Sequence, residues 1–350
     1  MKIAYIIPSL VRSGPIKVVY QLTEYLHREH DIDVFYLEDR TDRELMSFSV
    51  PVNKISFKEA IDFDMYDIVH SHTIVADWYI LRHHQKLKYC KSLTTIHNYA
   101  YEDLPMSYGK LKGYLMAFLW SIGTIKHDMQ IVLSHHAKIY YQKKWWPNKR
   151  FSPIYNGINQ KTLPQNSTNK NKELVSIGTI ASAGGINRRK GIDQIIKALT
   201  YLPENYHLYI AGKDTSESDI LKVLATKMNV LERVTFLGYV SDMDSFISQM
   251  DLFVVAPRSE GFSLALQEIV RYQKSVICSN LPIFHELFSE EEVTFFELEN
   301  IEDLAKAIEK GYKNRYVLAP KAYQKFLANY TSEIMAKNYL KQYKELVYGQ

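Results

Sequence analysis

At residues 257–268 the sequence reads Pro257-Arg258-Ser259-Glu260-Gly261-Phe262-Ser263-Leu264-Ala265-Leu266-Gln267-Glu268, directly after the apolar run Leu252–Val255. The apolar run predicts a buried strand, and the residues from about Ser263 predict a helix. One carboxylate, Glu260, therefore lies on the strand-to-helix loop, and a second, Glu268, lies on the helix. The backbone N–H groups of the helix's first turn lie between them and favour an anion. Two carboxylates flanking an anion site suit a ligand with hydroxyl groups at both ends and phosphate in the middle, such as a nucleotide sugar.

This segment, Glu260-Gly261-Phe262-Ser263-x4-Glu268 behind a hydrophobic strand, resembles the Glu-x7-Glu donor-site motif of the family-4 glycosyltransferases of GT-B fold. The resemblance implies that Glu260 hydrogen-bonds the transferred sugar and that Glu268 holds the ribose hydroxyls. It also implies that the donor site includes Gly261, Phe262 and the N–H groups of Ser263 and Leu264, which would hold the diphosphate. The alternative is a solvated loop acid and a surface helix acid, because two glutamates at this spacing are common. The preceding strand and the Gly-Phe-Ser insert favour the donor-site interpretation.

Composition indicates a two-domain globular protein. The chain has 350 residues, of which 46% are hydrophobic and 23% charged, and a net charge of +4 is too small to indicate nucleic-acid binding. The two cysteines, Cys90 and Cys278, lie in apolar segments, which fits buried thiols in a reducing compartment. The sequence lacks an apolar run of membrane-spanning length, and its first apolar run is too short for a signal peptide. We therefore expect a cytoplasmic protein.

The first segment has the layout of a phosphate-facing turn, with a strand at Lys2–Ile7, a loop containing Gly14 and a helix at about Ile16–Arg28. The resembling family usually has a Gly-Gly pair here, so Gly14 is expected to let the backbone approach the donor phosphates. A plain turn glycine is the alternative. Strands alternating with helices predict a parallel sheet with ligands at its carboxyl edge. The further strands expected in this half are Asp31–Leu37, Asp67–His72, Ser92–His97 and Met129–Ser134, with a helix at about Val75–Leu87.

Histidines mark this predicted sheet edge. His97 ends its strand there, and in the resembling family a histidine at this place contacts the donor sugar near the reacting carbon. We therefore expect a catalytic role for His97, with a structural histidine as the alternative. His70 and His72 point to one face of their strand, yet no third ligand is evident nearby. A structural role or a wall of the acceptor site is preferred to a metal site, and no metal or other cofactor is expected.

Residues 101–150 combine basic and aromatic side chains, with eight Lys or Arg against three acids. Basic and aromatic residues on amphipathic helices suit an anionic membrane surface. A solvated basic face over an aromatic core explains the same composition, and the sequence leaves both interpretations open. Nucleic-acid binding is disfavoured, because no recognised binding motif accompanies the charge.

The second half opens with the strand Leu174–Gly178, followed by an expected flexible loop from Thr179 to Asn187 that contains Gly184-Gly185. The resemblance implies that Arg189 and Lys190 neutralise the donor diphosphate without a metal. Many family members have an arginine where this chain has Thr179, and a solvated basic turn is the alternative.

Two shorter segments of this half are also informative. Residues 234–240 resemble the family's segment that receives the nucleotide base, so Tyr239 is placed in the donor site. Asp242-Met243-Asp244 matches a metal motif of a different transferase fold, but acids that cap a helix are the preferred explanation.

Taken along the chain, the resemblance implies an α/β protein of GT-B fold, with two Rossmann-like domains facing a central cleft. The expected boundaries are an acceptor domain at 1–158, a linker at 159–172, a donor domain at 173–331 and a helix at 332–350 that crosses back to the first domain.

The activity expected from the resemblance is retaining, metal-independent transfer from a nucleotide diphosphate sugar, with UDP favoured. The expected acceptor is a lipid-linked or polysaccharide glycan of the cell envelope, capsule or exopolysaccharide, met at the inner face of the membrane. Thr179 and the single Gly14 motivate one alternative, a non-catalytic nucleotide-sugar-binding subunit. A sugar-nucleotide epimerase of the same architecture is a second alternative.

Overall fold

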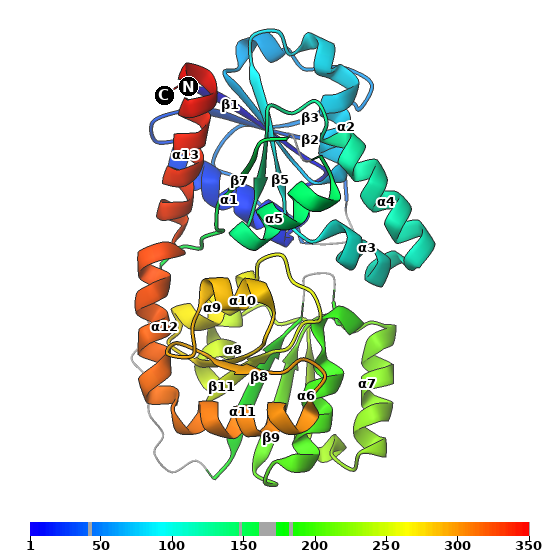
Figure 1. Ribbon diagram of the computed structural model, residues 1–350, viewed down its shortest axis with the longest axis vertical. Helices are drawn as coiled ribbons and strands as arrows, with labels where there is room; N and C mark the ends of the chain where they lie inside the picture. Colours follow the sequence, from blue (N-terminus) through cyan, green and yellow to red (C-terminus); the bar gives the residue numbers. More distant parts are fainter. Residues whose placement is uncertain (41–43, 147–148, 161–172, 182–184, 350) are drawn as a thin grey trace. The chain divides into compact units, whose positions relative to one another are not determined.

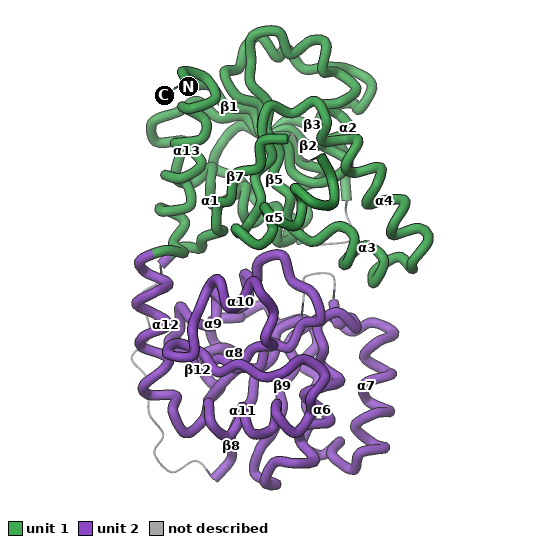
Figure 2. The backbone as a smooth tube through the Cα atoms, in the orientation of Figure 1, with its two compact units in different colours: residues 1–159, 329–350 green, residues 160–328 purple. Residues whose placement is uncertain are grey.

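The computed structural model describes residues 1–40, 44–146, 149–160, 173–181 and 185–349 (Figure 1). The chain divides into two compact units, Met1–Asn159 with Asn329–Gln350, and Gln160–Ala328 (Figure 2). We call them unit 1 and unit 2. Residues 161–172 of the expected linker and Gly184 of the expected glycine pair lie outside the described residues.

Unit 1 is built on a sheet in which every strand pair is parallel, in the order β3-β2-β1-β4-β5-β6-β7. Its central strands are buried along most of their length, as expected when helices cover both faces of a parallel sheet, although only β1 is a continuous apolar run. The strands are β1 (Lys2–Ile7), β2 (Asp31–Tyr36), β3 (Val52–Lys54), β4 (Ile68–His72), β5 (Lys91–Ile96), β6 (Met129–Val132) and β7 (Phe151–Pro153).

The helices of unit 1 come from both parts of its sequence. Helix α13, which follows unit 2 in the chain, lies beside α1, and the two are seen together in Figure 1. The helices are α1 (Gly14–Leu26), α2 (Ile74–His83), α3 (Ala100–Tyr108), α4 (Lys110–Gly123), α5 (His135–Lys144) and α13 (Ser332–Tyr348), with short 3-10 turns η1 (Phe63–Met65) and η2 (His84–Lys86).

A buried polar network attaches α13 to the sheet. The Tyr343 hydroxyl lies 2.7 Å from Nδ1 of His70 and 3.0 Å from the Tyr5 hydroxyl. The Tyr339 hydroxyl lies 3.0 Å from the Thr95 hydroxyl, which in turn lies 2.8 Å from Nε2 of His70. All five side chains are fully buried, and buried polar groups require such partners. His70 therefore has the structural role that the sequence favoured over metal binding.

Unit 2 repeats the arrangement with six parallel strands in the order β10-β9-β8-β11-β12-β13. The two sheets share one plan, because each extends outward in both directions from its first strand. The predicted α/β fold class is confirmed. The strands are β8 (Val175–Ile180), β9 (Tyr206–Ala211), β10 (Val234–Gly238), β11 (Leu252–Val255), β12 (Ser275–Ser279) and β13 (Thr294–Phe296).

One loop boundary in unit 2 was predicted wrongly. Thr179 and Ile180 were expected in a flexible loop but continue β8, because both pair in register with β9. The Thr179 hydroxyl also donates a hydrogen bond to the Val254 carbonyl at 2.9 Å, which ties β8 to β11.

The helices of unit 2 begin at capping side chains in several places. Oδ1 of Asp242 accepts the N–H of Ser245 at 2.9 Å, so the capping interpretation of Asp242-Met243-Asp244 is confirmed. The helices are α6 (Ile192–Ala198), α7 (Ser216–Lys227), α8 (Met243–Gln249), α9 (Leu264–Arg271), α10 (Pro282–Leu287), α11 (Ile301–Lys313) and α12 (Arg315–Asn329), with short turns η3 (Arg188–Lys190), η4 (Leu199–Tyr201) and η5 (Leu231–Arg233). None of the helices in the described ranges is both long and apolar enough to cross a membrane.

Candidate functional site

The strand order places the candidate site of unit 2 at the point where the sheet changes its direction of growth. The sheet reverses its direction of growth between β8 and β11, and ligands of open α/β sheets bind at the carboxyl ends of strands at such a switch point. The loop after β11 carries Glu260, and the turn η3, which follows β8 in the chain, carries Arg189 and Lys190. Three residues singled out from the sequence are therefore brought together by the fold.

Glu260 forms the centre of this cluster. Its Oε2 lies 2.8 Å from Nζ of Lys190 and 3.6 Å from Nη1 of Arg189, and the residue is only 8% exposed. Burial raises the pKa of the Glu260 carboxyl, but the charges of Lys190 and Arg189 outweigh it and hold the pKa below its usual value. The site thus contains an ionised carboxylate held between two cations.

Gly191 explains how the two cations come so close to Glu260. It adopts a left-handed conformation with φ +64°, and a Cβ at this position would lie 1.9 Å from the carbonyl oxygen of Ala256. Only glycine lets the turn η3 pack this tightly against the end of β11. Arg189 also connects η3 to the loop after β11. Its guanidinium donates a hydrogen bond to the Ser259 carbonyl at 2.8 Å, and its own carbonyl accepts the N–H of Arg258 at 2.8 Å.

Arg258 is a site-forming residue that the sequence did not reveal. Its Nη1 and Nη2 each lie 2.8 Å from a carboxylate oxygen of Asp193, and its Nε lies 2.5 Å from Oε1 of Glu299. Its Nη1 also donates to the carbonyl of Arg188 in η3 at 2.8 Å. Arg258 therefore clamps the turn that carries the cations to the loop that carries Glu260. Its partners lie 65 and 41 residues away in the chain, so only its closeness to Glu260 could have drawn attention to it.

The helix N-terminus next to Glu260 has the predicted form. Ser263 caps α9, and its hydroxyl accepts the N–H of Leu266 at 3.2 Å. Leu264 is the first residue of the helix, so its N–H belongs to the first turn, where helices have no intrahelical acceptor. Gly261 and Phe262, which precede this turn in the chain, are buried, and Glu268 is half-buried further along the same helix.

Tyr239 lies further from this cluster in the sheet. It follows directly on β10, which is separated from β8 by β9, and its side chain is exposed. It belongs to the same carboxyl edge as Glu260, but at the outer strand of the sheet.

His97 and Gly14 belong to unit 1. His97 follows directly on β5, is half-buried, and its Nε2 lies 2.9 Å from Nδ1 of the fully buried His72, with the two rings stacked. Burial lowers the pKa of His97 to about 3, against a smaller opposing effect of the Asp77 charge, so the ring is neutral near pH 7. Gly14 is the first residue of α1, after β1. Since the sheet of unit 1 reverses between β1 and β4, Gly14 lies at its switch point.

The basic and aromatic stretch of residues 101–150 divides into two kinds of side chain. Trp120, Tyr141 and Trp145 are buried in one aromatic core cluster, as the alternative interpretation expected. Leu111, Tyr114 and Phe118 on α4 are instead at least half exposed.

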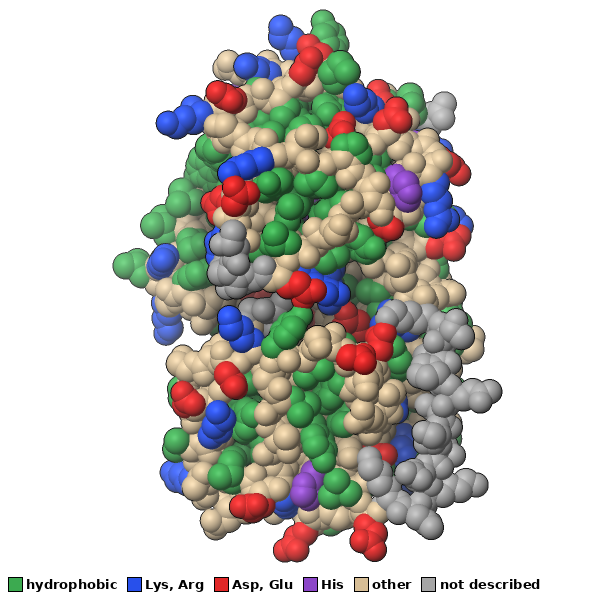
Figure 3. Space-filling model, turned by 180° about the vertical axis from the view of Figure 1, so that it is seen from behind, with side chains coloured by type: hydrophobic (Ala, Val, Ile, Leu, Met, Phe, Trp, Pro, Cys, Tyr) green, Lys and Arg blue, Asp and Glu red, His purple; other side chains and the backbone are tan. Residues whose placement is uncertain are grey.

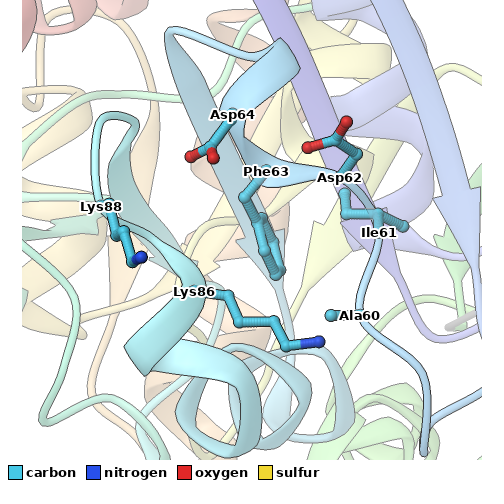
Figure 4. A pocket seen from close by; sticks show the side chains of 7 residues that line it. All are labelled: Ala60, Ile61, Asp62, Phe63, Asp64, Lys86 and Lys88. Carbon is cyan, nitrogen blue, oxygen red and sulfur yellow. The ribbon is translucent and has the colours of Figure 1, made fainter.

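Unit 1 also has a surface hollow with a volume of about 350 Å³, lined by residues 60–64, Lys86 and Lys88 (Figure 4). Figure 4 shows the two lysines on one side and Asp62 and Asp64 on the other. The lining residues precede β4 and β5, so the hollow lies at the amino ends of these strands, opposite the edge that carries His97. Among the described residues, no group of three or more His, Cys, Asp or Glu side chains is placed to hold a metal ion.

Comparisons with known proteins agree with this architecture. Residues 165–331 match the family model of glycosyl transferases group 1, and residues 13–161 match that of Glycosyltransferase Family 4. The O-antigen biosynthesis glycosyltransferase WclY of Escherichia coli is 34% identical to this chain over 99% of both sequences.

Solved structures share the fold at low sequence identity. Sucrose-phosphate synthase from Thermosynechococcus elongatus matches with a TM-score of 0.83 at 18% identity, covering 100% of both chains. HepE from Anabaena, solved in complex with UDP-glucose, matches with a TM-score of 0.75 at 15% identity, covering 99% of this chain and 100% of that chain. The chain has two α/β units, each unit matches a family model, and a relative is similar along the whole sequence. The chain therefore belongs to glycosyltransferase family 4 and has the GT-B fold.

Proposed function

We propose that the protein transfers a sugar, with retention of anomeric configuration and without a metal, from a UDP-sugar to a lipid-linked or polysaccharide acceptor in O-antigen-type polysaccharide assembly. The acceptor class is supported by the O-antigen role in the name of its relative WclY. The UDP donor is supported by the UDP-glucose bound to HepE, a protein of the same fold.

The observation that carries the proposal is the cluster of Glu260, Lys190 and Arg189 at the switch point of unit 2. Two cations beside a helix N-terminus suit a diphosphate, and they provide the positive charge that a metal ion supplies in other transferases. Glu260 lies beside both cations, where its carboxylate can accept a hydrogen bond from a sugar hydroxyl.

The cluster also suggests how the chemistry proceeds. As the bond between the anomeric carbon and the diphosphate oxygen breaks, its electron pair stays on the diphosphate, which Arg189, Lys190 and the first turn of α9 stabilise. The acceptor oxygen forms the new bond from the same face, and its proton passes to an oxygen of the departing diphosphate. Glu260 is a poor nucleophile in this arrangement, because two cations neutralise its charge. Four further donor contacts are proposed from the family resemblance alone. They are Gly14 with the phosphates, His97 with the sugar, Glu268 with the ribose and Tyr239 with the base.

The test is the variant Glu260→Gln, assayed for transfer from UDP-sugars to lipid-linked glycan acceptors. We expect transfer to fall by at least roughly a hundredfold, because the hydrogen bond to the sugar loses its charge. The matched control is Glu232→Gln, which removes the same charge from an exposed position of unit 2. Equal transfer by Glu260→Gln and the parent would contradict the role of Glu260, and a product of inverted configuration would contradict retention.

Nucleotide binding is measured separately, as the increase in thermal stability of the protein when UDP, GDP, ADP or CMP is added in the presence of EDTA. A ligand at 100 times its dissociation constant stabilises the folded state by about 2.7 kcal/mol, and we expect this for UDP with both the parent and Glu260→Gln. Stabilisation by UDP without turnover of any UDP-sugar would favour a non-catalytic binding subunit. Conversion of the donor sugar without acceptor would favour an epimerase.

A further inference from the structure

Helix α4 is apolar on two opposite faces, but unit 1 covers only one of them. Gly113, Ala117 and Trp120 form the covered face. A Cβ on Gly113 would lie 2.3 Å from the backbone nitrogen of Pro105, so α4 and α3 are in close backbone contact there. Figure 1 shows the two helices side by side at the edge of unit 1.

The opposite face of α4 consists of Leu111, Tyr114, Leu115 and Phe118, which we call the apolar stripe. These side chains are 88%, 51%, 55% and 51% exposed, respectively. Their spacing of three and four residues places them in one row along the helix. Met106 and Tyr108 at the end of α3 are also exposed, at 51% and 52%. In the view from behind, apolar side chains gather along the left edge of unit 1, where α4 lies (Figure 3). Contiguous apolar surface of this kind marks an interaction site.

The charges beside the apolar stripe are positive. Lys110 and Lys112 are exposed at the start of α4, and this helix contains no acidic residue. The acids of α3 face the body of the unit, since Glu102 accepts a hydrogen bond from the Tyr140 hydroxyl and Asp103 is buried. The surface thus combines a row of large apolar side chains with uncompensated lysines.

We propose that the apolar stripe docks unit 1 on an anionic lipid bilayer. Leu111, Leu115 and Phe118 would enter the boundary between headgroups and acyl chains, with the Tyr114 hydroxyl at headgroup level, while Lys110 and Lys112 contact lipid phosphates. The proposal rests on the proposed function only for its lipid-linked acceptor, which would be met at the same surface. A second copy of this chain fits the surface less well, because α4 has no acid to pair with the lysines of a partner's α4.

The experiment measures co-sedimentation of the full chain with vesicles of phosphatidylcholine, with and without phosphatidylglycerol. We expect binding to the anionic vesicles, weakened at least roughly tenfold in Leu111→Glu/Phe118→Glu. We expect the variant Lys110→Gln/Lys112→Gln to bind these vesicles roughly 30-fold more weakly than the parent and to lose most of the salt dependence.

The matched control is Ile220→Glu/Val223→Glu on α7, where the two apolar side chains are 60% and 69% exposed, and it should bind like the parent. Equal binding of the stripe variant and the parent, or no binding of the parent to anionic vesicles, would overturn the proposal. So would concentration-dependent dimerisation that the stripe variant abolishes, since it would assign the surface to a second copy. Transfer to a water-soluble acceptor analogue should persist in the stripe variant, and its absence in the parent would count against the proposed function without affecting the vesicle result.

Discussion

At the scale of single residues, the arrangement of the candidate site depends on Arg258. Its guanidinium contacts Asp193, Glu299 and the carbonyl of Arg188, so it joins its own loop to residues 188–193 and to Glu299, which are distant from it in sequence. Neither Asp193 nor Glu299 is part of the proposed donor contacts. Arg258 is thus a positioning residue, which acts through the turn that carries Arg189 and Lys190.

We expect Arg258→Gln to lower the free energy of unfolding by roughly 1.5–3 kcal/mol, because charged hydrogen bonds to Asp193 are lost. In the transfer reaction, KM for the donor should rise more than kcat falls, because the cations remain but are less well placed. The control Arg188→Gln removes an equal charge from an exposed neighbour and should change stability by less than about 0.5 kcal/mol. Donor KM and kcat are measured beside denaturant unfolding. A fall in kcat at unchanged KM would argue against positioning of the diphosphate cations.

The contrast between Glu260 and Arg258 shows what the sequence can predict of such a site. Glu260, Ser263 and Glu268 lie within one strand–loop–helix segment, so their relation can be inferred from local pattern alone. The pairing of Glu260 with Lys190 joins residues 70 positions apart, and the family resemblance supplied the role of Lys190. Arg258 has neither a local pattern nor a motif, because its partners lie in η3, at the start of α6 and in the segment before α11, and only the packing of unit 2 brings them to it.

At the scale of elements, the close approach of η3 to the end of β11 depends on one glycine. Gly191→Ala adds a Cβ that would overlap the Ala256 carbonyl and also strains a positive φ. The control Gly238→Ala has a nearly equal φ of +67° and no atom within 4 Å of its Cβ, so it reports the backbone strain alone. We expect the control to lose about 1 kcal/mol of stability and Gly191→Ala to lose at least about 2 kcal/mol more.

Donor binding should also change in Gly191→Ala. Gly191→Ala displaces the turn with Arg189 and Lys190, so stabilisation by UDP should weaken, measured as the shift of the thermal transition. A variant as stable as Gly238→Ala would show that η3 can move away from Ala256 at little cost.

Elements were predicted well where strand and helix alternate in clear apolar patterns, as in β1–α1 and β11–α9. No element was predicted between residues 289 and 331, where the structure has β13, α11 and α12. For α11 the signal was present, because Ile301, Leu304, Ala305 and Ile308 follow helical spacing behind the capping residue Asn300. For α12 it was weaker, because Pro320 lies within the helix, and proline usually indicates a helix end.

At the scale of the whole molecule, acid should lower the stability of unit 1 before it protonates Glu260 in unit 2. Burial lowers the pKa values of His70 and His72 well below the usual value, and that of His97 to about 3. Between pH 6.5 and 5 the unfolded chain therefore binds protons that the folded chain does not, and the free energy of unfolding falls as the pH falls. The lowered pKa of the Glu260 carboxyl acts only at more acidic pH, where its contribution is lost as the carboxylate is protonated.

We expect each of these histidines to contribute a slope of up to about 1.4 kcal/mol per pH unit in this window. The variant His97→Asn should reduce the slope by up to this amount. Denaturant unfolding from pH 7 to pH 5 measures the slopes. An unchanged slope in His97→Asn would show that this ring titrates normally in the folded protein.

The attachment of α13 to unit 1 has a consequence for biosynthesis. The ribosome makes residues 1–159, then the 160–328 unit, and only afterwards the tyrosines at 339 and 343 that fill the space against β1, β4 and β5. During translation, His70 and Tyr5 therefore lack the Tyr343 hydroxyl until the intervening unit has been synthesised. The nascent first unit should consequently be a target for chaperones, and a released chain that ends at residue 338 should have a protease-sensitive first unit and a folded second one.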